Sequence, residues 1–443
     1  TVYYLKSEKD LLEGFLKYIH FFDPDLIIGW HVIGFDLNFL YNKCLQHNLK
    51  LSIGRGNSNI ILEENPATGL TANLPGRLII DGPPVLRSAF YKYKDFKLET
   101  VATAVLGTGK DISSDQGKVE EIENRFKNDK MALAKYNILD CKLVHKIYSK
   151  LNIYSFIINR IKNTGLLYDR VNMSTTAFDF LYLPRLHRKG FVAPNRFDLS
   201  RETEGSGGLV LEPDVGAHST VGIFDFKSLY PSIIRTFGID PLALTTNDEH
   251  SIKTPSHHSF NKENAILPEL IADLMHKRAQ AKLNGQSAQQ QTIKILMNSF
   301  YGIMGSTKSR FYHHDLSSAI TETGQWILNQ TKNYFEQRGY KVLYGDTDSL
   351  FIKLRSINDI PDLLDNFNKT LSERLKNEFQ VNSFLELEHE MTFDQIFFPP
   401  GRGQNEGAKK RYVGISNKNL VFKGMESVRS DWTEVSKIFQ RKL

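Results

Sequence analysis

The sequence predicts a multidomain protein of mixed helices and strands, with an α/β first domain followed by an α+β part. Its 443 residues exceed an ordinary single domain, which holds about 100–200 residues. Short apolar strands alternate with helical stretches over the first 150 residues, a pattern typical of α/β domains. Further along, two long helical stretches are followed by strand pairs and by β-rich sequence. A hydrophobic fraction of 41% and a charged fraction of 24% indicate folded domains with buried cores.

The first domain is expected to begin with a helix. Ser7 and Asp10 have the spacing of a capping box, and apolar residues then recur at helical intervals. After the turn FDPD, the run LIIGW predicts a short buried strand. Residues 51–80 predict short strands that close on GRLIIDG, and residues 120–150 predict a helix that contains YNILD. We therefore place an α/β domain at residues 1–150.

The remaining sequence predicts a helical connector and then a larger α+β region. The Gly-rich stretch EGSGG (204–208) is a candidate hinge. The next strand is GIFDF, and residues 240–264 read as a polar loop with scattered histidines. Further predicted elements are helices at Leu267–Leu283, Ala288–Tyr301, 316–338 and 361–379, and two strands that flank YGDTDS.

Composition and charge exclude several classes of protein. The net charge of +6 is compatible with a polyanionic partner but does not prove one. The two cysteines, Cys44 and Cys141, are far apart, which argues against a disulfide scaffold or a cysteine zinc site and fits a reducing compartment. No run approaches the roughly 20 apolar residues of a membrane span, and no signal peptide is present. Because the chain begins at Thr1 and stops after RKL, we expect a fragment of a longer protein.

Two aspartates stand one residue apart in the hexapeptide YGDTDS (344–349). Strand-like runs flank it, so we predict a hairpin with Asp346 and Asp348 at its tip. Carboxylates in apolar surroundings are unfavourable unless a positive partner compensates them. Asp and Gly also favour ordinary turns, so the hexapeptide alone leaves a structural turn and a cation site equally open.

A third aspartate, Asp225, ends the predicted strand GIFDF. The following turn contains Ser228 and Pro231, which suit the start of a helix. An acid beside a helix N-terminus suits a site that binds a metal through the carboxylate and a phosphate through the helix amides. A helix-capping role for the acid is the ordinary alternative. Mg²⁺ prefers a few carboxylate oxygens and keeps positions for substrate phosphates. Two such ions about 4 Å apart are the arrangement that serves phosphoryl transfer.

Basic side chains recur on the two predicted helices between these acids. Arg278 and Lys282 are four residues apart and share a helix face, as Lys294 and Asn298 do on the next helix. Cations from two adjacent antiparallel helices could bind a triphosphate. Arg would make bidentate hydrogen bonds to the phosphate oxygens, and Lys would contribute a single positive charge. Each of these residues, taken alone, is more often a solvated surface group.

Taken together, these stretches resemble the polymerase motifs of family B DNA polymerases. DFKSLYPSII resembles the first motif, KILMNSFYG the second and YGDTDS the third, in the order of the family. GAKKRYVG (407–414) resembles the motif that contacts the primer. The resemblance implies a DNA-directed DNA polymerase that uses two Mg²⁺ ions to add dNTPs to the 3′-hydroxyl of primer-template DNA.

The resemblance implies a role for each matching position. Asp225 and Asp348 would be the main metal ligands, and Asp346 would be a less certain one. Tyr230 would lie under the sugar of the nucleotide as a steric gate, and Lys294 would also be catalytic. The other implied nucleotide contacts are Ser228, Leu229, Arg278, Lys282, Asn298, Tyr301 and Gly302. The implied DNA contacts are Gly207, Gly208, Lys409, Lys410, Arg411 and Tyr412.

The first 150 residues resemble the 3′–5′ exonuclease of the same family, which implies an RNase H-like fold. Asp36 in GWHVIGFDL, and Tyr136 with Asp140 in YNILD, match two of its motifs. Asp36 and Asp140 would bind Mg²⁺ or Mn²⁺, and Tyr136 would orient the attacking water. Where the family usually has asparagine, this chain has His31. The first exonuclease motif, DxE, would precede Thr1, so we expect only half of that metal site here.

The family resemblance also implies an order of domains and a set of partners. The implied domains are a partial exonuclease (1–150), a connector (151–204), an antiparallel palm sheet with helices in two parts (205–261 and 306–435), helical-hairpin fingers (262–305) and the start of a thumb (436–443). The implied partners include a sliding clamp, which would bind a segment beyond residue 443. No membrane partner is expected. A cytoplasmic, nucleoid-associated place in a bacterium and a role in DNA repair and replication restart are implied as well.

Two other functions are open to the same sequence, namely a nuclease only and a non-catalytic nucleic-acid-binding remnant. The intact polymerase motifs and the missing exonuclease motif weigh against the first. A remnant would have no reason to keep the acidic and basic motif residues together. One geometry would support the polymerase interpretation: Asp225 and Asp348 should converge within reach of one metal pair, facing Lys294 across a cleft.

Overall fold

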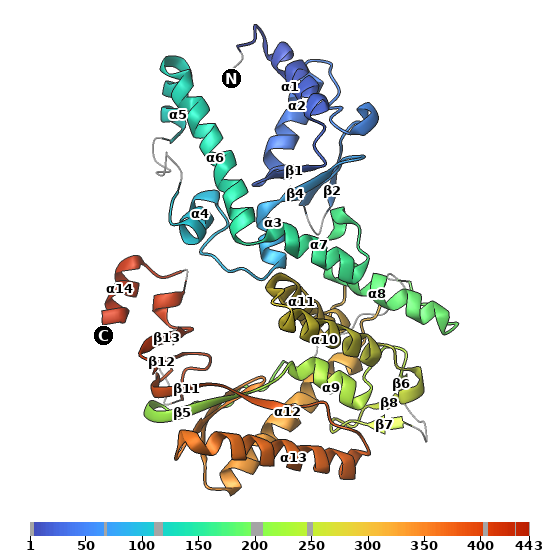
Figure 1. Ribbon diagram of the computed structural model, residues 1–443, viewed down its shortest axis with the longest axis vertical. Coiled ribbons are helices and arrows are strands. Elements are labelled where there is room, and N and C mark those ends of the chain that lie inside the picture. Colours follow the sequence, from blue (N-terminus) through green and yellow to red (C-terminus); the bar gives the residue numbers. More distant parts are fainter. Residues whose placement is uncertain are drawn as a thin grey trace. The chain divides into compact units, whose positions relative to one another are not determined.

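The computed structural model describes residues 4–65, 69–109, 118–195, 207–245, 251–401, 406–429 and 431–442. The chain divides into two compact units, Thr1–Met173 and Ser174–Leu443, each made of helices and strands (Figure 1). The division lies inside the predicted connector, whose last residues and most of the candidate hinge are outside the described ranges. In the part of the chain that the structure describes, no helix is long and apolar enough to cross a bilayer.

The N-terminal unit combines a small parallel strand pair with helices. Its elements are α1 (Glu8–Phe22), β1 (Leu26–Gly29), η1 (Ile33–Leu37), α2 (Asn38–Gln46), η2 (Arg55–Asn57), β2 (Ile61–Asn65), β3 (Gly69–Asn73), β4 (Leu78–Asp81), α3 (Gly82–Ser88), α4 (Leu98–Leu106), α5 (Lys118–Asn128), α6 (Lys130–Lys150), α7 (Ile153–Thr164) and η3 (Tyr168–Arg170). β1 pairs with β4 in parallel, and β2 pairs with β3 in an antiparallel hairpin.

Local sequence signals account for most of this unit. The hydroxyl of Ser7 accepts a hydrogen bond from the Asp10 amide at 3.1 Å, so the predicted cap and first helix are confirmed. The predicted strands in LIIGW and GRLIIDG are β1 and β4. Leu12, Leu37 and Cys44 meet in the core between α1 and α2. Cys44 is therefore a packing residue, in agreement with the expected absence of a disulfide framework.

The C-terminal unit is built on one six-stranded antiparallel sheet in the order β13-β12-β11-β5-β10-β9. Its elements are α8 (Ser174–Arg188), β5 (Gly216–Phe226), α9 (Leu229–Phe237), β6 (Leu244–Thr245), β7 (Ser251–Lys253), β8 (Ser259–Asn261), η4 (Lys262–Asn264), α10 (Leu267–Leu283), α11 (Ser287–Met304), α12 (His314–Gln337), β9 (Lys341–Asp346), β10 (Ser349–Lys353), η5 (Ile357–Asp359), α13 (Ile360–Phe379), β11 (Leu387–Phe398), β12 (Tyr412–Ser416), β13 (Asn419–Lys423), η6 (Glu426–Val428) and α14 (Glu434–Lys442). In Figure 1, α12 and α13 lie together below this sheet.

The predicted pair of helices is confirmed as α10 and α11. The first has the predicted bounds, and the second is slightly longer than predicted at both ends. Gly285 lies between them with a φ of 66°, a left-handed conformation that glycine adopts without strain. This turn lets two helices that are adjacent in sequence pack against each other.

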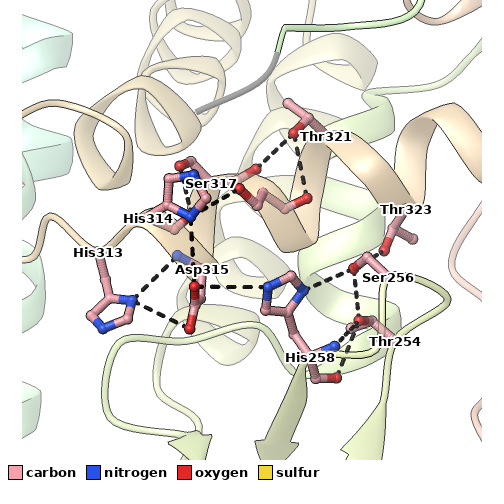
Figure 2. Close-up of polar contacts among 10 residues, drawn as sticks. Thr254, Ser256, His258, His313, His314, Asp315, Ser317, Thr321 and Thr323 are labelled. Atoms are coloured by element: carbon pink, nitrogen blue, oxygen red, sulfur yellow. Dashed lines mark hydrogen bonds and ion pairs between the residues drawn. The ribbon is translucent and has the colours of Figure 1, made fainter. Parts of the chain in front are cut away.

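The prediction of a plain loop at 240–264 is wrong, because the described residues of this segment form the small sheet β6-β8-β7. Its strands are too short and polar to produce a periodic signal, but Phe260 of β8 is fully buried. The turn between β7 and β8 is fastened to α12 (Figure 2). There the Ser256 hydroxyl lies 3.1 Å from His258 Nδ1 and 3.5 Å from the Thr323 hydroxyl. His258 of this turn, with His313 and His314 at the start of α12, surrounds Asp315 at 3.6–3.9 Å.

Candidate active site

The sheet brings together two aspartates that are far apart in the sequence. Asp225 is the penultimate residue of β5, and its register partner on β10 is Ser349. Asp348 directly precedes β10, and the backbone amide of Phe226 donates to its carbonyl oxygen at 2.9 Å. Asp225 and Asp348 therefore lie at neighbouring strand ends.

The turn between β9 and β10 is tight and strained. Thr347 has a φ of 60°, which is unfavourable for a β-branched residue. The turn is held by a bond from the Thr347 amide to the Leu209 carbonyl at 2.8 Å and by one from Leu211 to Gly345 at 2.9 Å. At Gly208 a Cβ atom would lie 2.8 Å from Thr347 Cγ2, so this close approach requires glycine. The segment that begins at Gly207 thus supports the turn that carries the acids.

Burial and mutual repulsion disfavour negative charge at this strand end. Burial raises the pKa of Asp225 to about 7, with further contributions from the negative charges of Asp348 and Glu390, while the positive charge of Lys294 opposes the shift. Burial likewise raises the pKa of Asp348, and the neighbouring Asp346 adds to it. A cation between the two carboxylates would relieve both effects. Lys294 of α11 is close enough for its positive charge to affect the pKa of Asp225.

Asp346 lies in different surroundings from Asp348. Its Oδ1 atom is 2.8 Å from the ammonium group of Lys410 and also accepts a bond from the Thr347 hydroxyl at 3.0 Å. The Lys410 backbone amide is fixed in turn by the Tyr344 hydroxyl at 2.9 Å. Asp346 thus already has a cationic partner within the chain, which separates it from the pair Asp225 and Asp348.

The donor atoms fit a magnesium site that is completed by substrate. Among the described residues, no group of three His, Cys, Asp or Glu side chains is arranged to hold a metal ion. Asp225 and Asp348 supply hard carboxylate oxygens from only two protein residues. Mg²⁺ is commonly bound through one or two carboxylates plus phosphate oxygens. The chemistry of the pair is therefore suitable for Mg²⁺ that arrives with a phosphate ligand.

Several residues predicted to contact a nucleotide gather beside the acids. The rings of Tyr230 and Tyr301 are 4.6 Å apart. Arg278 Nη1 donates to the Ser228 hydroxyl at 3.2 Å, which links α10 to the turn before α9. Leu229 is the first residue of α9. The side chains of Lys282, Lys294 and Asn298 are exposed on α10 and α11, and Gly302 is exposed as well.

The residues predicted to contact the primer lie around β12 and are already engaged within the chain. Lys409 forms an ion pair with Glu212 at 3.0 Å, and Arg411 forms one with Glu426. Tyr412 packs its ring against Phe351 at 5.1 Å. With the Lys410 pair described above, all three consecutive cations have an acidic partner that DNA phosphates would have to replace.

The predicted exonuclease residues are brought near one helix of the N-terminal unit. Asp36 lies in the π-helical turn η1, while Tyr136 and Asp140 lie one turn apart on α6. The pKa of Cys141 is raised by burial and then by the negative charges of Asp140 and Asp36. Asp36 therefore lies within electrostatic reach of the same part of α6.

Sequence reasoning missed Asp81, which supports the turn that carries Asp36. Asp81 ends β4, is 9% exposed, and accepts a hydrogen bond from the His31 amide at 2.6 Å. His31 has a φ of 57°, a conformation in which asparagine is also favoured. The signal for Asp81 was an acid at the end of an apolar strand, the same signal that pointed to Asp225.

Two glutamates near Asp225 were also missed. Glu388 is the register partner of Asp225 on β11, and Glu390 lies where the register shifts between His389 and Met391. Such a bulge changes the direction of a side chain, and the charges of both glutamates raise the pKa of Asp225. Alternating glutamates in LELEHE (385–390) were the available signal, because residues two apart share a face of a strand.

Comparison with known proteins places the chain in a class. The model of the DNA polymerase family B matches residues 171–443, and the model of the exonuclease domain of this family matches residues 1–101. The chain belongs to DNA polymerase family B, so the resemblance inferred from the motifs is confirmed. Asp36 lies within the exonuclease match, whereas Tyr136 and Asp140 lie beyond it.

Particular relatives refine this picture. The chain is 40% identical to DNA polymerase II of Escherichia coli (strain K12), over 99% of this chain and 58% of that polymerase. It is 30% identical to a DNA polymerase of Archaeoglobus fulgidus, over 99% of this chain and 54% of the relative. The chain thus spans somewhat more than half the length of these relatives. Its fold is similar to that of the family B DNA polymerase from Pyrobaculum calidifontis, with a TM-score of 0.70, 21% identity, and coverage of 100% of this chain and 59% of that one.

Proposed function

We propose that the protein is a DNA-directed DNA polymerase, in which a primer 3′-hydroxyl attacks the α-phosphate of a dNTP. The observation that supports this most is the adjacency of Asp225 and Asp348 at the strand ends of a family B chain, with Lys294 near enough to lower the pKa of Asp225. Phosphoryl transfer needs charge stabilisation and positioning more than covalent chemistry. A carboxylate pair beside helical cations supplies both.

Each side chain has a proposed task. Asp225 and Asp348 would hold two Mg²⁺ ions, which when bound activate the attacking oxygen and stabilise the leaving one. Arg278 and Lys294, with Lys282 further along α10, bind the triphosphate. Tyr230 excludes a 2′-hydroxyl beneath the sugar. In this interpretation the six-stranded sheet is the palm, α10 and α11 are the fingers, and α14 begins the thumb.

We further propose that the N-terminal unit is part of an RNase H-like 3′–5′ proofreading exonuclease. Asp36 and Asp140 would bind Mg²⁺ or Mn²⁺ there. The similarity to DNA polymerase II favours a role in repair and replication restart at the bacterial nucleoid, with a sliding clamp as partner.

Primer extension by the protein as its gene encodes it tests the proposal. With Mg²⁺ and dNTPs, the unchanged protein should extend a primed template. Asp348→Asn should lower the extension rate at least about 10²-fold, the scale of losing one strong electrostatic contact to the transition state. Asp365→Asn, at an exposed position of α13, is the matched control. Equal rates for Asp348→Asn and the control would refute the metal assignment, and no extension by the unchanged protein would refute the function.

A further inference from the structure

A buried carboxylate outside the active site joins three elements of the C-terminal unit. Asp240 follows α9 and is 0% exposed. Its Oδ1 atom accepts hydrogen bonds from the Tyr182 hydroxyl at 2.6 Å and the Leu242 amide at 2.7 Å. Its Oδ2 atom accepts bonds from the amides of Ile266 at 2.9 Å and Leu267 at 2.6 Å. A buried carboxylate is tolerated only when donors surround it, and here four donors fix its position.

Two of these bonds form the cap of α10. The N-cap residue Ile266 has no side chain that can accept a bond from the first helical amides. Asp240 takes this role from a distance of 26 residues in the sequence. A carboxylate at this end of a helix satisfies the unpaired amides and interacts favourably with the helix dipole. Through Tyr182, the same carboxylate ties the start of α10 to α8.

The start of α10 controls where the side chains near its other end lie. Arg278 is 11 residues after Leu267, or about 16 Å along the axis at the usual rise per residue. A tilt of about 5° at the start would therefore displace Arg278 by roughly 1.4 Å. Misplacement by about 1 Å at a reacting centre can lower a rate about 10²-fold.

Two polar contacts of α10 with neighbouring helices lie further along the helix than its first amides. Arg185 of α8 lies 3.8 Å from Asp273, but the Asp273 side chain is 65% exposed, and exposed ion pairs contribute little. Arg235 of α9 approaches the sulfur of Met275 at 3.2 Å, in the middle of the helix. Neither contact satisfies the first amides of α10.

We propose that Asp240 is a positioning residue that fixes the base of α10 and thereby sets where Arg278 meets the triphosphate. This inference rests on the proposed polymerase function. It assigns Asp240 no contact with substrate, because its effect passes through the helix. Tyr182 supports the same arrangement from α8.

The first test is steady-state primer extension by Asp240→Asn in the protein as its gene encodes it. The amide nitrogen of Asn would face backbone donors that now bond a carboxylate oxygen. We expect the KM for dNTP to rise about tenfold or more, while the KM for primer-template changes less than about twofold. Asp273→Asn, an exposed carboxylate on the same helix, should leave both constants unchanged. An unchanged dNTP KM in a folded Asp240→Asn protein overturns the proposal.

A double-mutant cycle separates positioning from a general loss of stability. Arg278→Ala alone should raise the dNTP KM, and adding Asp240→Asn should then raise it little further, because residues that act through one another are not additive. If the double variant raised the dNTP KM by the product of the two single fold-increases, the proposal would be contradicted. If Asp240→Asn does not fold, Tyr182→Phe takes its place, with an expected rise of about threefold that Arg278→Ala should likewise absorb; no rise, or a rise that persists in that background, overturns the inference. If the unsubstituted protein did not extend a primer at all, the proposed polymerase function itself would be refuted.

Discussion

The two acidic sites of this chain rest on different kinds of scaffold. In the C-terminal unit, Asp225 and Asp348 lie on neighbouring strand ends, so the hydrogen-bond register of the sheet fixes their separation. In the N-terminal unit, Asp36 lies on a short π-helical turn and Asp140 on the long helix α6. That turn depends on one side chain, Asp81, for its orientation. A register distributes the positioning over many backbone bonds, whereas a side-chain support concentrates it in one residue.

The largest expected effect is on primer extension, and it tests whether the acidic sites of the two units act independently. Asp225→Asn should lower primer extension at least about 10²-fold, whereas Asp36→Asn should leave extension within about twofold, because the two acids belong to separate sites. Extension assays on matched primer ends measure both variants. A strong loss of extension in Asp36→Asn would show that the two sites are not independent.

Sugar selection should depend on the ring pair in the C-terminal unit. Tyr230→Ala removes the ring that lies against Tyr301 and opens space beneath the sugar. We expect ribonucleotide incorporation relative to deoxyribonucleotide to rise about 10- to 100-fold, the scale on which pockets discriminate small groups. Competing incorporation of the two sugars measures this ratio. Tyr340→Ala, at a tyrosine that is not part of the site, serves as the control, and an unchanged ratio in Tyr230→Ala removes its role as a gate.

The hydrogen bond from the His31 amide to Asp81 should contribute to the free energy of unfolding of the protein. Asp81→Asn weakens the acceptor for the His31 amide, so we expect the unfolding free energy to fall by about 1–3 kcal/mol. Chemical denaturation of the protein measures the change. Glu123→Gln, at an exposed acid on α5 of the same unit, should change stability far less. Equal stability of the two variants would mean that the turn does not depend on Asp81.

The smallest expected effect concerns Lys410, which forms an ion pair with Asp346 beside the proposed metal ligands. Lys410→Ala removes the ion pair with Asp346 and one proposed phosphate contact, so the slope of log affinity against log salt for primer-template should fall by about 1. Binding measured at several salt concentrations gives the slope. Lys376→Ala on α13 should leave it unchanged. An unaltered slope for Lys410→Ala would assign this lysine to the turn alone and not to DNA.

Much of the C-terminal unit could be predicted because its local signals agree with its tertiary contacts. α10 begins and ends where the sequence indicates, and the strands predicted at GIFDF and on both sides of YGDTDS are β5, β9 and β10. The sheet at 240–264 could not be predicted, since its strands of two or three residues have no periodicity. Asp240 was missed for another reason, because the amides of Ile266 and Leu267 that it binds are distant in sequence. Asp81 had the local signal of an acid at a strand end, but no local pattern reveals its contact with the His31 amide, which is 50 residues away.

β9 is the last strand of the six-stranded sheet, and an uncovered strand edge is a template for pairing with another chain. The segment from Leu209 to Asp214 bonds along this edge, with its amides donating to the carbonyls of Gly345 and Leu343 at 2.9 and 2.8 Å. This segment of the C-terminal unit therefore occupies backbone groups that β9 would otherwise present to another chain. A truncated protein that begins after Asp214 would expose the backbone of β9 and is expected to self-associate.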